Sequence, residues 1–306
     1  MFEKYADQVH ILIRMLPIVA GEHVFALKGG TAINFFIRNM PRLSVDIDLT
    51  YLPSESFADS LTNIDKAFGR IEAAAKTAAP EITIQKISGG GNLATRLKAS
   101  QGKAYIKIET SPVLRGAIET PVKMQVCDAV QDAYGFAEID ILAFDELYAG
   151  KVHAALDRQH PRDLFDIFHL YENEGLSDTL FKIFLVYAAS SGRPMHELLN
   201  PNLKELDEPY TQEFLGMTGE EIDLKSLADV RVRLIKDIQS RLHGDAAQFL
   251  LSLHDAQPDF GLIGLPGAKT FPAIGWKLKN LEKLKAENPE KHRAQGDALK
   301  ALLKTS

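Results

Sequence analysis

Two aspartates stand two residues apart in the stretch RLSVDIDLTYL, residues 42–52. Apolar residues alternate with Asp46 and Asp48, which is the period expected of a strand with one buried face. The two carboxylates therefore share the other face, where they repel unless cations neutralise them, one holds a proton or the face is wet. Magnesium fits this pattern, because it takes hard oxygen ligands and bridges carboxylates to substrate phosphates.

A third acid, Glu109, ends the stretch YIKIE at residues 105–109. A strand with Asp-x-Asp beside a strand ending in Glu can hold two metal ions, which clamp the attacking and leaving oxygens of a phosphoryl transfer. We therefore predict a two-metal Mg²⁺ site formed by Asp46, Asp48 and Glu109. Taken singly, each motif is also typical of an ordinary solvent-facing strand.

A glycine pair lies just upstream, in LKGGTAIN at residues 27–34. A short apolar run precedes the glycines and a helix with Thr31 as its cap is expected to follow. Glycines in such a turn let backbone N–H groups approach a phosphate, and the helix N-terminus adds positive partial charge. A plain strand-to-helix turn is the alternative. The predicted nucleotide contacts here are Lys28, Gly29, Gly30, Thr31, Arg42 and Ser44.

A third candidate region begins with the helical pattern DELYAGKVHAALDR, residues 145–158. Lys151 lies on the face of Leu147 and Ala155, so its charge can reach into a cleft from the edge of an apolar stripe. Asp163 and Asp166 share one side of the next expected helix. Lys151 would either neutralise the charge of a triphosphate or form an interhelix salt bridge with one of these aspartates.

The four motifs in order, K-G-G-T-A-I-N, R-L-S-V-D-I-D-L, I-K-I-E and Y-A-G-K-V-H-A-A-L-D-R-Q-H-P-R-D-L-F-D, resemble the AbiEii-type nucleotidyltransferases over roughly residues 27–170. These are toxins of bacterial toxin–antitoxin and phage abortive-infection systems, within the DNA polymerase beta-like nucleotidyltransferase superfamily. The usual turn of the wider superfamily is Gly-Ser, whereas Gly30 here carries no hydroxyl, which leaves open whether Thr31 supplies that contact.

The resemblance implies a role for each matching residue. Gly29 and Gly30 match the phosphate-binding turn, and the Asp46–Asp48 pair and Glu109 match the three metal-binding carboxylates. Lys151 matches a lysine that engages the nucleotide, and either Asp163 or Asp166 matches the acid of an arginine–aspartate motif. The predicted catalytic set is thus Asp46, Asp48, Glu109, Lys151, Asp163 and Asp166.

The expected fold is α+β, with a nucleotidyltransferase domain of mixed sheet and flanking helices over residues 1–175 and an α-helical domain over residues 176–306. Strands are expected at 81–87, 104–112, 121–128 and 136–142, and a helix at 57–78. The glycine-rich stretch between the first two strands, residues 88–102, is expected to be a hairpin tip or loop.

Composition limits the class of protein. The 306 residues carry a formal net charge of -6 and a single cysteine, Cys127, so no internal disulfide can form and a reducing, cytoplasmic setting is expected. The N-terminal apolar run is broken by Arg14 and Pro17, which is poor for a signal peptide, and no membrane span is expected. A local basic stretch at residues 82–108 contains no acid and fits the steering of phosphates.

The expected reaction is magnesium-dependent transfer of a nucleotide from an NTP to an acceptor hydroxyl, with release of pyrophosphate. The resemblance implies the 3′ end of tRNA as the acceptor and a cognate antitoxin as partner. Modification of a small molecule, modification of a protein, and non-catalytic NTP binding remain as alternatives.

Overall fold

The computed structural model describes residues 3–90 and 93–305. The chain divides into two compact units, one of residues 1–147 with 213–221 and one of residues 148–212 with 222–306. This division differs from the predicted boundary near residue 175. Residues 148–175, which were predicted to belong to the first domain, fall in the second unit. The reason is that α6 (Pro161–Asn173) packs against α10 (Leu224–Ser240) of that unit.

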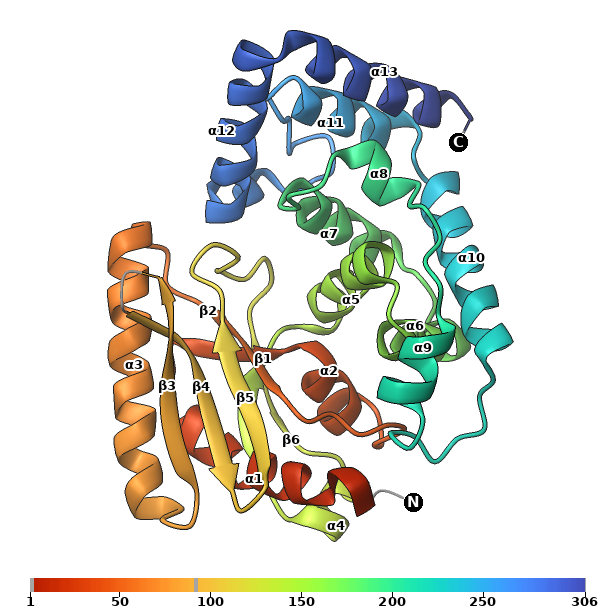
Figure 1. The fold of residues 1–306 in the computed structure, drawn as a ribbon. Coiled ribbons are helices and arrows are strands. Elements are labelled where there is room, and N and C mark those ends of the chain that lie inside the picture. The colour runs from red at the N-terminus through yellow and green to blue at the C-terminus, as the bar shows by residue number, and fades with distance from the viewer. Residues whose placement is uncertain (1–2, 91–92, 306) are drawn as a thin grey trace. The chain divides into compact units, whose positions relative to one another are not determined.

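The first unit is built on one mixed sheet, which has seven strands in the described residues, in the order β3-β4-β5-β2-β1-β7-β6 (Figure 1). Strand pairs β2–β5 and β1–β7 are parallel and the other neighbours are antiparallel. The strands are β1 (Phe25–Lys28), β2 (Ile47–Tyr51), β3 (Thr83–Gly90), β4 (Leu93–Gln101), β5 (Ala104–Thr110), β6 (Val122–Gln125) and β7 (Glu138–Ile141).

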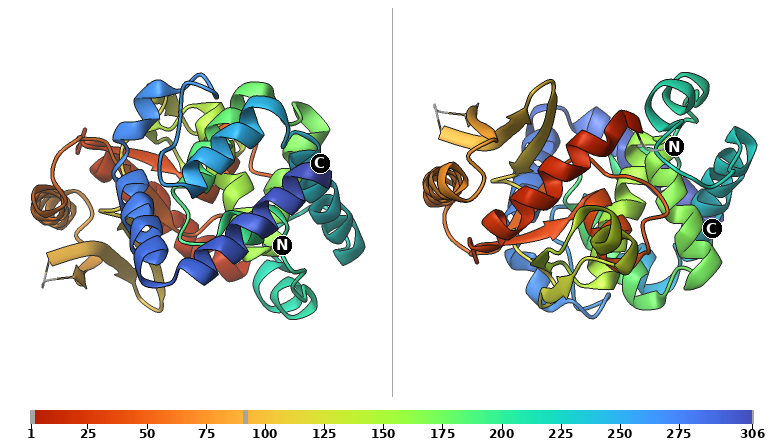
Figure 2. Two further views of the ribbon diagram at one scale, coloured as in Figure 1. Left: turned by 90° about the horizontal axis from the view of Figure 1, so that it is seen from above. Right: turned by 90° about the horizontal axis from the view of Figure 1, so that it is seen from below.

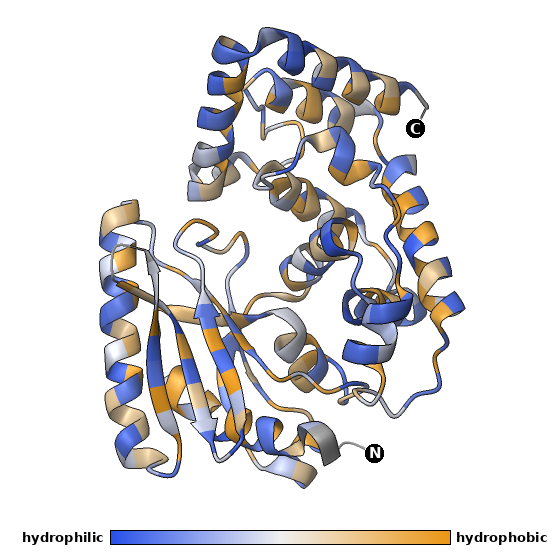
Figure 3. Cartoon of the chain, in the orientation of Figure 1, coloured by the Kyte–Doolittle hydropathy of each residue, from blue (hydrophilic) through white to orange (hydrophobic). Residues whose placement is uncertain are grey.

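Alternation of apolar and polar side chains positions the central strands. Ile47, Leu49 and Tyr51 of β2 are buried, as the period of two predicted, while Asp48 between them is half-buried. Blue and orange alternate in the same way along β4 and β5 in Figure 3. One face of each strand therefore belongs to the core, and the other face can carry charged groups.

Helices α1 (Glu3–Ala20) and α3 (Phe57–Ala78) contact each other and pack on the sheet, α1 on β5 and β7, and α3 on β3 and β4 (Figure 1). The N-cap of α3 is Ser56, whose hydroxyl accepts a hydrogen bond from the Asp59 N–H at 3.1 Å. Two shorter helices complete the unit, α2 (Gly29–Ala32), which continues into a π-helical turn (Ile33–Ile37), and α4 (Asp128–Tyr134).

Two local predictions were wrong. The predicted hairpin is present between β3 and β4, but residues 93–101, which were expected in its tip or in a loop, form strand β4. In this strand Leu97 and Ala99 are buried while Arg96 is exposed. The glycines before it masked this strand in the sequence; Gly91 and Asn92 lie outside the described residues. Thr31 does not cap the helix, because α2 already begins at Gly29 with Lys28 as its N-cap.

The second unit is helical, as predicted for the C-terminal part of the chain. Helices α12 (Pro272–Glu287) and α13 (Pro289–Thr305) run in clearly different directions (Figure 2) and pack on each other. The remaining helices are α5 (Phe144–Arg158), which begins in the first unit, α7 (Asp178–Ala189), α8 (Met195–Leu199), α9 (Asp207–Pro209) and α11 (Gly244–His254). None of the helices in the described chain has the length and apolar character that crossing a membrane would require.

Candidate functional site

The turn between β1 and α2 brings the chain against Asp48. Gly29 has a φ of 75°, a conformation that favours glycine, and a Cβ at this position would lie 2.6 Å from Asp48 Oδ2. Both the backbone angle and the space therefore require glycine. Asp48 also pairs with Lys28 in the antiparallel register of β1 and β2, so the predicted phosphate turn and one predicted metal ligand are neighbours.

The other predicted nucleotide contacts gather on the second glycine. A Cβ on Gly30 would lie 2.7 Å from an Arg42 guanidinium nitrogen and 3.2 Å from Ser44 Oγ. Thr31 Oγ1 lies 2.8 Å from Ser44 Oγ and donates a hydrogen bond to the Asp46 carbonyl at 2.5 Å. Thr31 thus ties the helix start to the segment carrying Asp46. Arg42 is also a buried side chain rather than a surface charge.

Asp48 and Glu109 are partners in the parallel register of β2 and β5. Neighbouring strands lie about 4.8 Å apart, so the two side chains emerge side by side. Glu109 is engaged by Arg96 of β4, whose Nε donates to Glu109 Oε2 at 2.6 Å. Both side chains of this ion pair are substantially exposed, at 47% for Arg96 and 37% for Glu109. Such a pair is weak and can exchange for another cation.

Asp46 lies just before β2 and is oriented by β5. Its Oδ1 accepts a hydrogen bond from the Lys107 backbone N–H at 3.2 Å. Across residues 3–90 and 93–305, no group of three or more His, Cys, Asp or Glu side chains is gathered closely enough to hold a metal ion. The fold therefore brings Asp46, Asp48 and Glu109 to one region of the sheet without closing them into a ready-made cluster.

Lys28 places a cation among these acids. Burial lowers the pKa of Lys28, whereas the charges of Asp48, Glu109 and Glu146 act in the opposite direction. Glu146 is fully buried, and its carboxylate accepts hydrogen bonds from the Ile118 N–H at 2.9 Å and 3.0 Å. The acidic side chains thus hold a lysine at the end of β1, next to the glycine turn.

Lys151, Asp163 and Asp166 belong to the second unit, where they form a buried ion cluster. The Lys151 Nζ lies 2.8 Å from Asp163 and 2.9 Å from Asp166, and all three side chains are at most 5% exposed. Burial alone would raise the pKa of Asp163, but Lys151 and Arg158 outweigh it and hold that pKa below its ordinary value. The interhelix salt bridge that the sequence allowed is therefore present, made to both aspartates.

Three polar residues of this region were missed in the sequence, namely Asn34, Arg96 and Glu146. The Asn34 amide donates to the Gly30 carbonyl at 3.0 Å and so supports the turn. Recognition of strand β4 in the sequence would have indicated Arg96. In that strand Arg96 points to the face opposite the buried Leu97, and it is the register partner of Glu109. Nothing in the sequence indicated that Glu146 is buried, because a single acid in an amphipathic helix resembles a surface residue.

Comparison with known proteins identifies the family and a similar fold. The family model described as "Nucleotidyl transferase AbiEii toxin, Type IV TA system" matches residues 10–280. Among solved structures, the fold is similar to MenT4, a nucleotidyltransferase toxin from Mycobacterium tuberculosis H37Rv, with a TM-score of 0.61 and 13% identity over 90% of this chain and 93% of that chain. No curated protein matches the chain. At this identity the structural likeness concerns the fold alone.

Proposed function

Because the chain belongs to the AbiEii family of nucleotidyltransferase toxins of type IV toxin–antitoxin systems, we propose that it transfers a nucleotide from an NTP to the 3′ end of tRNA in a magnesium-dependent reaction. The observation that carries the proposal is the position of Asp48. This carboxylate is in register with Glu109 on one side and against Gly29 on the other. Acids for cations and a backbone turn for phosphate thus meet at one point.

The donor chemistry at this point suits magnesium. Asp46, Asp48 and Glu109 offer only carboxylate oxygens, which are the hard ligands that Mg²⁺ takes, and partial exposure leaves room for the waters that it retains. Bound ions would supply charge stabilisation for the phosphoryl transfer. Arg96 competes with a bound cation for Glu109, whereas the Lys107 N–H bonds only Oδ1 of Asp46 and is compatible with a cation on that carboxylate.

The triphosphate would lie along the turn at Gly29 and Gly30. Arg42, buried beside Gly30, and Lys28 offer positive charge there, and an arginine can make two parallel hydrogen bonds to a phosphate. In this proposal Ser44 and Thr31 position the turn. Lys151 would assist the nucleotide only if the ion cluster with Asp163 and Asp166 opened.

Support for a polynucleotide acceptor comes from strands β4 and β5. Lys98 and Lys107 stand directly opposite each other in the antiparallel register of these strands. Like charges in that relation are destabilising, so this pair suits a surface that meets an anionic partner. Lys98 also lies 4.4 Å above the ring of Tyr105, which is 43% exposed and can stack on a base. A tRNA acceptor would place the reaction in the cytoplasm.

Purified protein incubated with each labelled NTP, magnesium and total tRNA tests the proposal. Label in tRNA, lost after removal of magnesium, is the expected result. Label in a low-mass acceptor or in a polypeptide would instead favour the alternative substrates, and magnesium-dependent NTP binding without transfer would favour a binding module. Co-expression with the neighbouring gene product tests whether an antitoxin relieves growth arrest, including arrest during phage infection.

Replacing both Lys98 and Lys103 by Glu tests the acceptor surface separately. Fewer phosphate contacts should weaken tRNA binding and flatten its salt dependence, since the slope reports the number of phosphates neutralised. Lys66→Glu with Lys76→Glu on α3 is a control of equal charge change. An unaltered salt slope in the Lys98–Lys103 variant would remove β4 and β5 from the acceptor site.

A further inference from the structure

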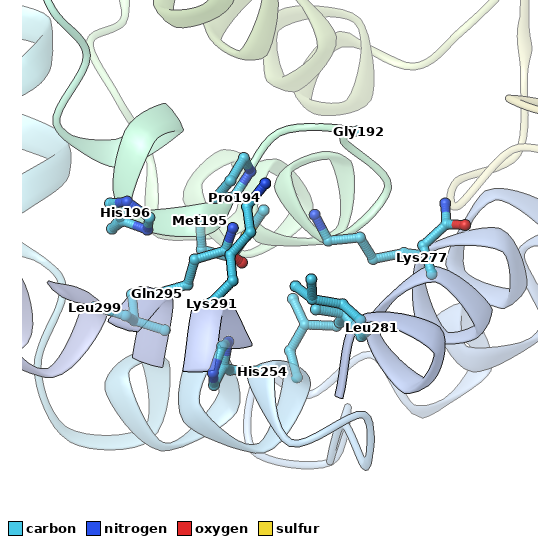
Figure 4. A pocket seen from close by; sticks show the side chains of 13 residues that line it. Gly192, Pro194, Met195, His196, His254, Lys277, Leu281, Lys291, Gln295 and Leu299 are labelled. Atoms are coloured by element: carbon cyan, nitrogen blue, oxygen red, sulfur yellow. The ribbon is translucent and has the colours of Figure 1, made fainter. Parts of the chain in front are cut away.

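A pocket of 250 Å³ lies within the helical unit, and no residue of the proposed site is among those that line it (Figure 4). Its walls come from the segment that begins α8 and from helices α11, α12 and α13. Four positively charged or titratable nitrogen-bearing side chains line it together with the amides of Asn280 and Gln295, namely His196, His254, Lys277 and Lys291. No carboxylate is among the residues that line it.

Lys277 is the unusual member of this pocket. Its side chain is 7% exposed, and its Nζ donates to the backbone carbonyls of Ser191, at 2.8 Å, and Arg193, at 2.5 Å. Both acceptors are neutral, and in the part of the chain that the structure describes Lys277 makes no ion pair. An ammonium has three N–H donors, so one remains available. A buried charge without a counter-ion is costly, and an anion in the pocket would remove that cost.

A second ammonium is available on the facing helix. Lys291 of α13 also makes no ion pair within residues 3–90 and 93–305, and in Figure 4 Lys277 and Lys291 extend toward the same segment, Gly192–Pro194. His254 is held in place by its ring, which stacks on His292 at 4.1 Å and bonds the His292 carbonyl through Nε2. Two lysines that converge without carboxylates suit a group with two negative charges.

The pocket is also lined by apolar side chains, those of Met195, Leu253, Leu281, Leu284 and Leu299. Apolar walls with a few convergent polar groups are typical of small-molecule sites, which commonly measure about 300–1,000 Å³. At 250 Å³ this pocket is small for that class. A free phosphate would make no contact with the leucines. A phosphate group attached to a single aromatic ring would contact both the lysines and the leucines.

We propose that this pocket binds a small phosphate monoester with a compact apolar or aromatic body, whose dianionic phosphate is held by Lys277 and Lys291 while its body contacts the leucines. The burial of Lys277 lowers its pKa from 10.5 to about 8, which leaves it mainly protonated at neutral pH. The site is separate from the proposed nucleotide turn, and binding requires neither magnesium nor the AbiEii reaction. It gives the helical unit a ligand of its own.

Calorimetric titration of the full-length protein with phenyl phosphate in EDTA tests this site. We expect saturable binding of one equivalent, at least about 10-fold tighter than inorganic phosphate or phenol. Lys277→Met and Lys291→Met should each weaken it about 10-fold or more, as expected for loss of a hydrogen bond between charged groups. Lys279→Met, an exposed lysine of α12 outside the pocket, is the matched control and should bind as the wild type does.

Three results would overturn the proposal. They are absence of saturable binding to folded wild-type protein, undiminished binding by both lysine variants, and inorganic phosphate binding as tightly as phenyl phosphate. Lys291 is exposed, so Lys291→Met keeps the test decisive if Lys277→Met fails to fold. A 5′-phosphorylated oligonucleotide distinguishes the source of the phosphate. Tighter binding than phenyl phosphate, lost in the same variants, would identify a nucleic-acid end and overturn the small-molecule assignment.

Discussion

Asp48 on β2 and Glu109 on β5 are direct register partners on neighbouring parallel strands. This pairing joins two residues that are sixty-one positions apart in the chain. It lies beside the end of β1, where the glycine turn begins. Glu109 is simultaneously the register partner of Arg96 on its other side. The candidate site is therefore a row of four charged residues across β4, β5, β2 and β1, in which Arg96 and Lys28 flank the two acids.

Replacing Asp48 by Asn should reduce nucleotide transfer at least about 100-fold, because it removes a charge proposed to hold the cations of the transition state. The unfolding midpoint should change little, since Asp48 is half-buried and serves no apolar core. Initial rates with labelled NTP and circular dichroism give the two measurements. Asp132→Asn, an exposed acid of α4, is the control. Full activity of the Asp48 variant would refute the assignment.

Replacing Arg96 by Gln should lower the magnesium concentration needed for half-maximal activity by up to about five-fold. The exposed Arg96–Glu109 pair is worth about 0.2–1 kcal/mol, which is the energy an incoming cation must replace. Magnesium titration of the rate measures the effect. Lys98→Gln removes a charge from the same strand without touching Glu109, so its magnesium dependence should match the wild type. A higher requirement in the Arg96 variant would show that the arginine assists the acids.

Comparison of Gly29→Ala with Gly102→Ala distinguishes the effect of backbone strain from the effect of a steric clash between the new Cβ and Asp48. Both glycines have positive φ, 75° and 59°, so each alanine should cost about 1–2 kcal/mol of stability. Only at Gly29 does the new Cβ meet Asp48, whereas nothing lies within 4 Å at Gly102. Denaturant unfolding should show similar losses, and activity should fall only for Gly29→Ala. Equal activity of the two variants would argue against a tight turn at Asp48.

Lys151→Met should destabilise the protein by about 3–5 kcal/mol, because it removes a buried cation from two buried aspartates. Arg158→Met is the matched control. That arginine also contacts Asp163, but its side chain is 62% exposed, and the expected loss is below about 1 kcal/mol. Urea unfolding compares them. If Lys151→Met keeps wild-type stability but loses NTP affinity, the lysine serves the nucleotide rather than the helical unit.

The pH dependence of stability should reveal Lys277. Its pKa is about 8 in the folded protein and 10.5 when unfolded, so between these values the unfolded chain binds more protons. The free energy of unfolding should therefore rise with pH across this window, by about 3 kcal/mol relative to Lys277→Met. Below pH 8 both states are protonated and the difference becomes constant. A parallel pair of pH profiles would contradict the assignment.

Local pattern was enough to predict much of the candidate site. Alternation along residues 42–52 identified the buried face of β2 and put Asp48 on the other face. The glycine pair indicated a turn in which the backbone can closely approach another group. The order of the motifs indicated the family. These inferences succeed because strand period and glycine conformation are properties of a few consecutive residues.

Only the tertiary structure decided which charges meet. Strand pairing set Arg96 against Glu109 and Lys98 against Lys107, and register between distant strands is not encoded in either strand alone. Helix packing enclosed Lys151 with both aspartates and moved the division between the units to residue 147. It also buried Lys277 with no counter-ion among the described residues. The sequence around a charged residue does not show whether its side chain is surrounded by water, an acid or a ligand. That environment is formed by segments far away in the chain.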